Sequence, residues 1–142
     1  MRLRQADVYG GIRVNLRPRP GIPELLDALD RHQIPFGIAS NSTLPWVEAH
    51  LEIVGLRAYF DVIVTRDQVK TPKPAPDSYL EACRRLGADP ARSVAFEDSP
   101  FGVMAAKAAG MKCVACPSWL TVGRDFSEAD SVVEQLSEAV LI

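Results

Sequence analysis

The stretch VAFEDSPFGVMAAKAAGM, residues 94–111, decides the fold that we expect for this chain. Its apolar start, residues 94–96, predicts a buried strand, and the alanine-rich segment 99–110 predicts a helix. Two adjacent carboxylates, Glu97 and Asp98, stand between them. Neighbouring negative charges at a strand end repel each other unless a positive group lies between them. The stretch therefore predicts a strand, then a junction where the two carboxylates bind a positively charged group, and then a helix.

The alternation of strand and helix continues on both sides of this stretch. Helical patterns occur at residues 21–32, 44–56, 75–87 and 99–110, and a short helix is expected within 127–141. Short apolar runs predict buried strands at residues 34–40, 60–65, 93–97 and 112–116. Near-continuous apolar strands that alternate with helices are typical of a parallel sheet covered on both faces. The expected fold class is therefore α/β, in three layers.

Length and composition limit the function classes. The chain has 142 residues, enough for one domain with a real core, and its net charge of -2 argues against nucleic-acid binding driven by bulk charge. No apolar stretch approaches the length of a membrane span, and the N-terminus lacks the apolar region of a signal peptide. We expect a cytoplasmic protein with neither a nucleic-acid nor a membrane partner. The odd number of cysteines indicates reduced, structural thiols at Cys83, Cys113 and Cys116.

Polar residues follow the predicted strands at their carboxyl ends, where ligands bind in a parallel sheet. Ser40 and Asn41 precede a helix, so the hydroxyl and nearby backbone N–H groups suit a phosphate oxygen. The other interpretation is that one of residues 40–43 only caps that helix. Lys73 lies between two prolines, which would aim its ammonium at a phosphate or at a carboxylate. The candidate phosphate-binding residues are therefore Ser40, Asn41 and Lys73.

Glu97 and Asp98 are the candidate metal ligands. Adjacent carboxylates at a strand end can share a hard cation such as Mg2+, directly or through water. Alternatively, one of them bonds to Lys73 or to backbone, or Asp98 or Ser99 caps the following helix. A cap needs only one such residue, and Ser40 and Lys73 are expected at the same edge, so the metal interpretation is favoured.

Together these segments resemble the haloacid dehalogenase (HAD) superfamily, in its branch of phosphoglycolate-phosphatase-like and β-phosphoglucomutase-like enzymes. IASNS is similar to the second family motif, KPAPDSYLEA to the third and FEDSPFGVMAAKAAGM to the fourth, in order over about residues 17–140. The resemblance implies a Rossmann-like sandwich and Mg2+-dependent phosphoryl transfer from small phosphorylated metabolites through an aspartyl-phosphate. It also implies a phosphate-binding hydroxyl at Ser40, the motif lysine at Lys73, and Mg2+ residues at Glu97 and Asp98.

The first family motif is missing from this chain. That motif is an apolar strand ending in D-x-D-G-[TV], in which the first Asp is the nucleophile and the second is the general acid/base. Asp7 is the nearest candidate, but it follows MRLRQ and has no second Asp two residues on. We therefore identify no catalytic residue. Residues 1–19 are interpreted as the remnant of a helical cap, and residues 20–142 as the HAD-like core domain.

The missing strand would lie in mid-sheet, between the strands at 36–40 and 93–97. Its loss would leave unpaired backbone groups in the core. Three repairs are open: residues 8–16 pair into the gap, the two flanking strands close on each other, or another chain supplies a strand in a dimer. The first repair is favoured because IRVNL alternates apolar and polar residues.

Three functions remain open for a chain of this kind. The first is a hydrolase-family protein whose activity depends on residues absent here. The second is a non-catalytic module that binds phosphate and metal. The third is a scaffold with an exposed edge for association. The retained site residues favour the first two. Without a nucleophile those residues offer only positioning and charge stabilisation, so the chain alone is expected to have negligible phosphatase activity.

Overall fold

The computed structural model describes residues 16–136, and helices alternate with strands along them. The α-helices are α2 (Ile22–Arg31), α3 (Leu44–Ile53), α4 (Asp77–Leu86) and α5 (Pro100–Ala108). The strands are β1 (Ile38–Ala39), β2 (Ile63–Val64), β3 (Val94–Glu97), β4 (Lys112–Ala115) and β5 (Ser131–Val132). Short 3₁₀ helices η1 (Arg57–Tyr59), η2 (Arg66–Gln68) and η3 (Pro90–Arg92) lie in connections. The predicted α/β class is confirmed, and no helix in this range is long and apolar enough to cross a bilayer.

The strands pair in parallel, but they form two sheets instead of one. β1 pairs with β2, and β4 lies between β3 and β5. Within residues 16–136 no ladder joins β1 to β3. Direct closure of these two strands on each other, one of the three repairs considered, is therefore wrong for the described chain. The favoured repair falls on residues 8–16, of which all but Leu16 lie outside the described residues.

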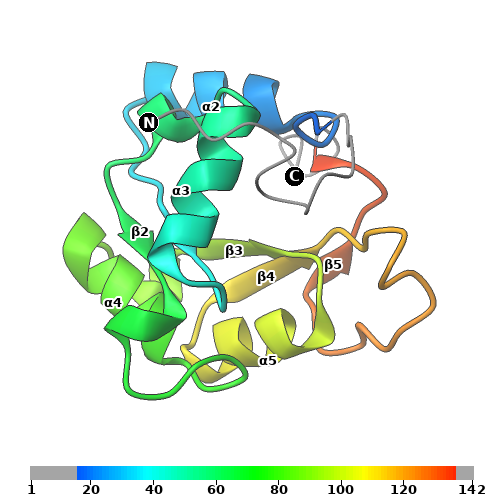
Figure 1. Ribbon diagram of the computed structural model, residues 1–142. Helices are drawn as coiled ribbons and strands as arrows, with labels where there is room; N and C mark the ends of the chain where they lie inside the picture. Colours follow the sequence, from blue (N-terminus) through cyan, green and yellow to red (C-terminus); the bar gives the residue numbers. More distant parts are fainter. Residues whose placement is uncertain (1–15, 137–142) are drawn as a thin grey trace.

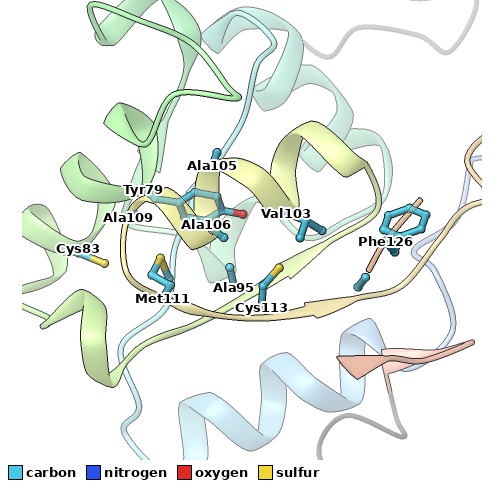
Figure 2. Packing of buried hydrophobic residues seen from close by; sticks show 11 residues of the cluster. Tyr79, Cys83, Ala95, Val103, Ala105, Ala106, Ala109, Met111, Cys113 and Phe126 are labelled. Atoms are coloured by element: carbon cyan, nitrogen blue, oxygen red, sulfur yellow. The ribbon is translucent and has the colours of Figure 1, made fainter. Parts of the chain in front are cut away.

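Helices cover both sides of the strands (Figure 1). On one side α4 and α5 pack on β3 and β4, and this cluster is the largest part of the core (Figure 2). Its side chains are small where helix and strand meet most closely, at Ala95, Ala105, Ala106 and Ala115. On the other side α2 and α3 pack on β1 and β2 through Leu26, Val47 and Ile63. This arrangement is the predicted three-layer sandwich.

One side of β3 is left uncovered. Val94 is 48% exposed and Phe96 is 37% exposed, although a central parallel strand normally buries both faces. Phe96 lies opposite Val114 of β4, and Val114 packs against the cluster that contains Leu25 of α2. The exposed side chains therefore face the α2 side, at the place where no strand connects β1 with β3.

The C-terminal part differs from the prediction. Residues 131–132 form β5 beside β4, so the short helix expected within 127–141 does not include them. Leu136 is helical, and residues 137–142 lie outside the described residues. The Asp130 N–H donates to the Cys113 carbonyl at 2.9 Å, and the Val133 N–H donates to the Ala115 carbonyl at 2.8 Å. These bonds pair the outer edge of β4, which would otherwise present unsatisfied carbonyls, and this pairing overrides the local helical pattern.

Candidate functional site

The carboxyl ends of β1 and β3 meet at the side chain of Lys73. Its Nζ donates to the Ala39 carbonyl of β1 at 2.9 Å and forms an ion pair with Glu97 Oε1 of β3. The lysine side chain is 8% exposed and that of the glutamate 7%. A buried charge requires a partner, and each of these residues is the other's partner. Lys73 thus ties the two sheets together at the edge where a ligand was expected.

The Glu97 carboxylate is held from two further sides. The Tyr79 hydroxyl of α4 donates to Glu97 Oε1 at 2.5 Å. Gly102 of α5 lies directly against the carboxylate, since a Cβ built on Gly102 would stand 1.8 Å from Oε2. The alternative in which one acidic residue bonds to Lys73 is therefore confirmed for Glu97.

Tyr79 is a site residue that the sequence analysis did not single out. The signal was its position six residues after Lys73, which puts both on the loop and first turn that lead into α4. Burial, followed by the negative charge of Glu97, raises the pKa of Tyr79 well above its ordinary value. The phenol therefore remains a neutral hydrogen-bond donor at all pH values near neutrality.

Cys113 of β4 lies in the same electrostatic surroundings. Burial, followed by the charges of Glu97 and Asp130, raises the pKa of the Cys113 thiol to about 11. A thiol with so high a pKa is a poor nucleophile at neutral pH. Cys83 and Cys116 are buried as well, which fits the expected structural role of the thiols.

Asn41 anchors the loop that carries Lys73. Its Oδ1 accepts from the Lys73 N–H at 2.8 Å, and its Nδ2 donates to the Lys73 carbonyl at 3.1 Å. Both polar atoms of the amide thus face the backbone of the lysine. The structure places Asn41 at the expected edge, and its role as a direct phosphate ligand stays a prediction.

Ser40 lies at the same edge, between β1 and α3. Its Oγ accepts from the Ser42 N–H at 3.1 Å in a local turn. Thr43 occupies the N-cap position of α3 and makes no side-chain cap hydrogen bond. Ser40 is therefore not the cap of that helix, and its hydroxyl retains a proton to donate to a ligand. Phosphate binding by Ser40 stays a prediction.

Asp98 follows the end of β3 and is exposed. The α5 cap is Ser99, whose Oγ accepts from the Gly102 N–H at 3.1 Å, so the Asp98 carboxylate is not used for capping. The Asp98 carbonyl accepts from Thr121 Oγ1 at 2.6 Å, which ties the loop after β4 to this edge. The exposed carboxylate is chemically suited to a cation.

A divalent cation would find only part of its ligand set here. Glu97 Oε1 already serves Lys73 and Tyr79, and Asp98 is the remaining carboxylate of the pair. In the part of the chain from 16 to 136, no three His, Cys, Asp or Glu side chains are grouped to hold a metal ion. Mg2+ prefers near-octahedral coordination by oxygen atoms. Mg2+ usually keeps several waters and takes one or two carboxylates from a protein, so Asp98 can supply one ligand, and Mg2+ binding by Glu97 and Asp98 stays a prediction.

The arrangement can bind and orient an anion. An ammonium has three N–H groups, and Lys73 directs two of them to Ala39 and Glu97. The third has only a long contact of 3.5 Å with the Tyr79 hydroxyl, which a phosphate oxygen can replace. The Ser40 hydroxyl and the backbone N–H groups of the following turn offer further donors. Such groups can stabilise a phosphate electrostatically, but they form no covalent bond to phosphorus.

Comparisons with known proteins bear on the family of this chain. The family model described as haloacid dehalogenase-like hydrolase matches residues 6–116. The putative phosphatase YhcW of Bacillus subtilis is 42% identical over 125 residues, which cover 88% of this chain and 57% of the relative. Protein CbbY of Cereibacter sphaeroides is 39% identical over 84% of this chain and 54% of its own length.

Solved structures show the same relationship. The crystal structure of CbbY from Rhodobacter sphaeroides in complex with phosphate superposes with a TM-score of 0.85, at 37% identity, over 94% of this chain and 59% of that one. A putative β-phosphoglucomutase from Thermotoga maritima gives a TM-score of 0.81 at 35% identity, over 89% of this chain and 61% of that one. This chain thus spans little more than half the length of these relatives. It belongs to the haloacid dehalogenase-like hydrolases, in their phosphatase and phosphomutase-like branch.

Proposed function

We propose that this chain is the phosphate-binding core of a Mg2+-dependent hydrolase that acts on small phosphorylated metabolites. The observation that carries the proposal is the buried Lys73 ammonium, fixed between Ala39 of β1 and Glu97 of β3 at the carboxyl ends of the strands. A relative of similar fold has been crystallised with phosphate, which supports an anion as the ligand class.

We further propose that these 142 residues do not catalyse turnover by themselves. Phosphoryl transfer through an aspartyl-phosphate needs a carboxylate oxygen that attacks phosphorus as the bond to the leaving oxygen breaks. Glu97 is occupied by Lys73 and Tyr79, and the sequence has no D-x-D-G motif. The nucleophile, together with further ligands for Mg2+ beside Asp98, would come from residues other than these 142.

The open edges of β1 and β3 offer a place for such residues. Backbone groups on the edge of β3 away from β4 have no ladder partner in the described chain, and Val94 and Phe96 are exposed beside them. An extended strand added here would end beside Lys73, because the carboxyl ends of parallel strands share one edge. An aspartate at the end of that strand would face the bound phosphate.

The test measures phosphate binding and turnover separately. Titration of inorganic phosphate by ³¹P NMR should show binding to the 142-residue chain, and Lys73→Ala should weaken it at least about tenfold, as expected for loss of a charged hydrogen bond. Lys70→Ala is the matched control, since Lys70 is exposed three residues away. Binding that is unaffected by Lys73→Ala would contradict the proposed site.

Turnover is measured with p-nitrophenyl phosphate and Mg2+. The expected rate for the chain alone is that of the buffer. Mg2+-dependent hydrolysis that disappears in Asp98→Ala or Glu97→Ala would show that the chain carries its own nucleophile, and the proposed inactivity would then be wrong.

A non-catalytic module that associates through its open edge is the second candidate function. It is favoured by the exposed apolar side chains of β3, Val94 and Phe96. Light scattering coupled to size-exclusion chromatography distinguishes the two. The associating module would be favoured by two results together. The wild type would be a stable dimer that becomes monomeric in Phe96→Lys, and the wild type would bind phosphate no better than the Lys73→Ala variant does.

A further inference from the structure

Tyr79 contacts both charges of the buried ion pair. Its hydroxyl donates to Glu97 Oε1 at 2.5 Å and lies 3.5 Å from Lys73 Nζ. Its ring also lies against the ammonium, with Nζ 4.6 Å from the ring centroid. The side chain is only 8% exposed. Figure 2 shows it among the alanine side chains of α5, with its hydroxyl pointing away from Met111 and Cys83. A tyrosine that only filled space would not need its hydroxyl here.

The hydroxyl changes how the negative charge of Glu97 is balanced. With Tyr79 present, Oε1 accepts from two donors, the ammonium and the phenol. Without the phenol, the Lys73 ammonium would have to balance that oxygen alone. A phosphate group would then compete with a more strongly bound carboxylate for the same positive charge.

The ring adds a second, geometric constraint. An ammonium that rests on an aromatic face is attracted to the negative charge density of the ring. Lys73 Nζ is thus confined between the ring, the Ala39 carbonyl and the Glu97 carboxylate. A flexible four-carbon side chain loses much of its rotamer freedom in this arrangement before any ligand binds, which reduces the entropy cost of binding.

We infer that Tyr79 is a positioning residue for anion binding, which shares the charge of Glu97 so that Lys73 keeps part of its positive charge for a phosphate group. The inference rests on the proposed function, because that proposal gives Lys73 its phosphate. It assigns Tyr79 no contact with the phosphate itself. Tyr79 affects phosphate binding through Glu97. Variants at positions 79 and 97 can therefore distinguish this effect from a packing effect of the tyrosine ring.

The experiment measures the dissociation constant of inorganic phosphate for the full 142-residue chain by ³¹P NMR at pH 7.5. Tyr79→Phe keeps the ring and removes the hydroxyl, and we expect about fivefold weaker binding, the effect of losing one hydrogen bond to a charged group. Tyr59→Phe is the matched control, because the Tyr59 hydroxyl donates to Asp27 at 2.6 Å on the exposed surface. Tyr59→Phe should bind phosphate as the wild type does.

A double-mutant cycle with Glu97→Gln tests whether Tyr79 affects phosphate binding through Glu97. If Tyr79 acts through the glutamate charge, Tyr79→Phe should change phosphate affinity by less than about twofold in the Glu97→Gln background. Wild-type affinity in Tyr79→Phe, or losses that multiply in the double variant, would overturn the inference. Circular dichroism confirms that each variant is folded.

A fluorinated residue gives a second test that changes the packing least. Placing 3-fluorotyrosine at position 79 makes the phenol a stronger donor, and its pKa remains high because the site is buried. We expect tighter phosphate binding, the opposite of the effect of Tyr79→Phe, whereas unchanged or weaker binding would contradict the inference. If the wild-type chain binds no phosphate, or if Lys73→Ala binds as well as the wild type, the proposed function itself is wrong and this inference falls with it.

Discussion

Gly102 shows how strongly a single position constrains the site. In an ordinary helix, replacing glycine by alanine stabilises the protein by up to about 1 kcal/mol. In Gly102→Ala the new methyl group would stand 1.8 Å from Glu97 Oε2, and the carboxylate would have to leave Lys73 and Tyr79. Displacing a buried carboxylate from its partners is costly. We therefore expect a loss of about 2 kcal/mol or more in the free energy of unfolding, measured by urea titration.

The sign of this change decides the role of Gly102. A gain in stability would show that Glu97 is free to move and that the pair is loosely held. The control is the same substitution in a Glu97→Ala background, where the obstructing carboxylate is gone. There Gly102→Ala should be neutral or stabilising, because only the higher helix propensity of alanine remains.

The separate residues of the site were predictable to different degrees. Ser40, Lys73 and Asp98 follow strands at their carboxyl ends, and a topological rule brings such residues to one edge. Which carboxylate pairs with the lysine could not be predicted, because that depends on side-chain direction and on the space that Gly102 leaves. The role of Tyr79 was hidden because a buried aromatic residue on a helix normally indicates only core packing.

Helix α5 begins at a cap that the sequence left open between Asp98 and Ser99. In the structure Ser99 Oγ accepts from the Gly102 N–H at 3.1 Å, whereas the Asp98 carboxylate takes no part in the cap. Ser99→Ala should therefore reduce the free energy of unfolding by about 1 kcal/mol, the usual value of an N-cap. Thermal or urea unfolding measures the change.

Asp98→Ala is the matched control for the cap, since it removes a polar side chain one residue earlier. It should leave the stability within about 0.5 kcal/mol of the wild type, as expected for an exposed position. A larger loss in Asp98→Ala than in Ser99→Ala would mean that the cap is wrongly assigned. The comparison also keeps stability effects apart from any loss of cation binding in Asp98→Ala.

The strands and helices from 22 to 115 follow the predicted order because each has a strong local pattern. Two features that the local patterns did not predict have non-local causes. β5 forms because the edge of β4 needs hydrogen-bond partners, and no local pattern of residues 131–132 reports that need. The division into two sheets arises because the strand expected between β1 and β3 is absent from the described chain, so pairing stops on both sides.

The ion pair between Lys73 and Glu97 serves both the fold and the site. Lys73 joins β1 to β3 where no ladder connects them, and its ion pair is covered by α4 and α5. Disturbing the pair should therefore affect phosphate affinity and the cohesion of the two sheets together. This coupling distinguishes the chain from a protein whose binding residues lie on independent loops. It also makes the protonation of groups around the pair a matter of stability.

Alkaline pH should destabilise the protein through Tyr79. Burial and the charge of Glu97 raise the folded-state pKa of this phenol above its ordinary value of 10.0. The native state therefore favours the protonated phenol, and the stabilisation is fully present below pH 10. Above that pH the unfolded chain releases a proton that the folded chain retains, so stability falls by up to about 1.4 kcal/mol per pH unit. Cys113, whose pKa is raised to about 11, adds a loss that begins near its ordinary value of 9.0.

Urea unfolding at pH 8, 10 and 11 measures this dependence. Between pH 10 and 11 the wild type should lose stability more steeply than Tyr79→Phe, which has no proton to release at that position. Tyr59→Phe separates the buried tyrosine from an exposed one, and it should retain most of the wild-type slope. Parallel slopes for the wild type and Tyr79→Phe would show that the phenol ionises as readily in the folded chain as in the unfolded one. Tyr79 would then lie outside the low-dielectric environment of Lys73 and Glu97, and the interpretation of this pair as buried would be contradicted.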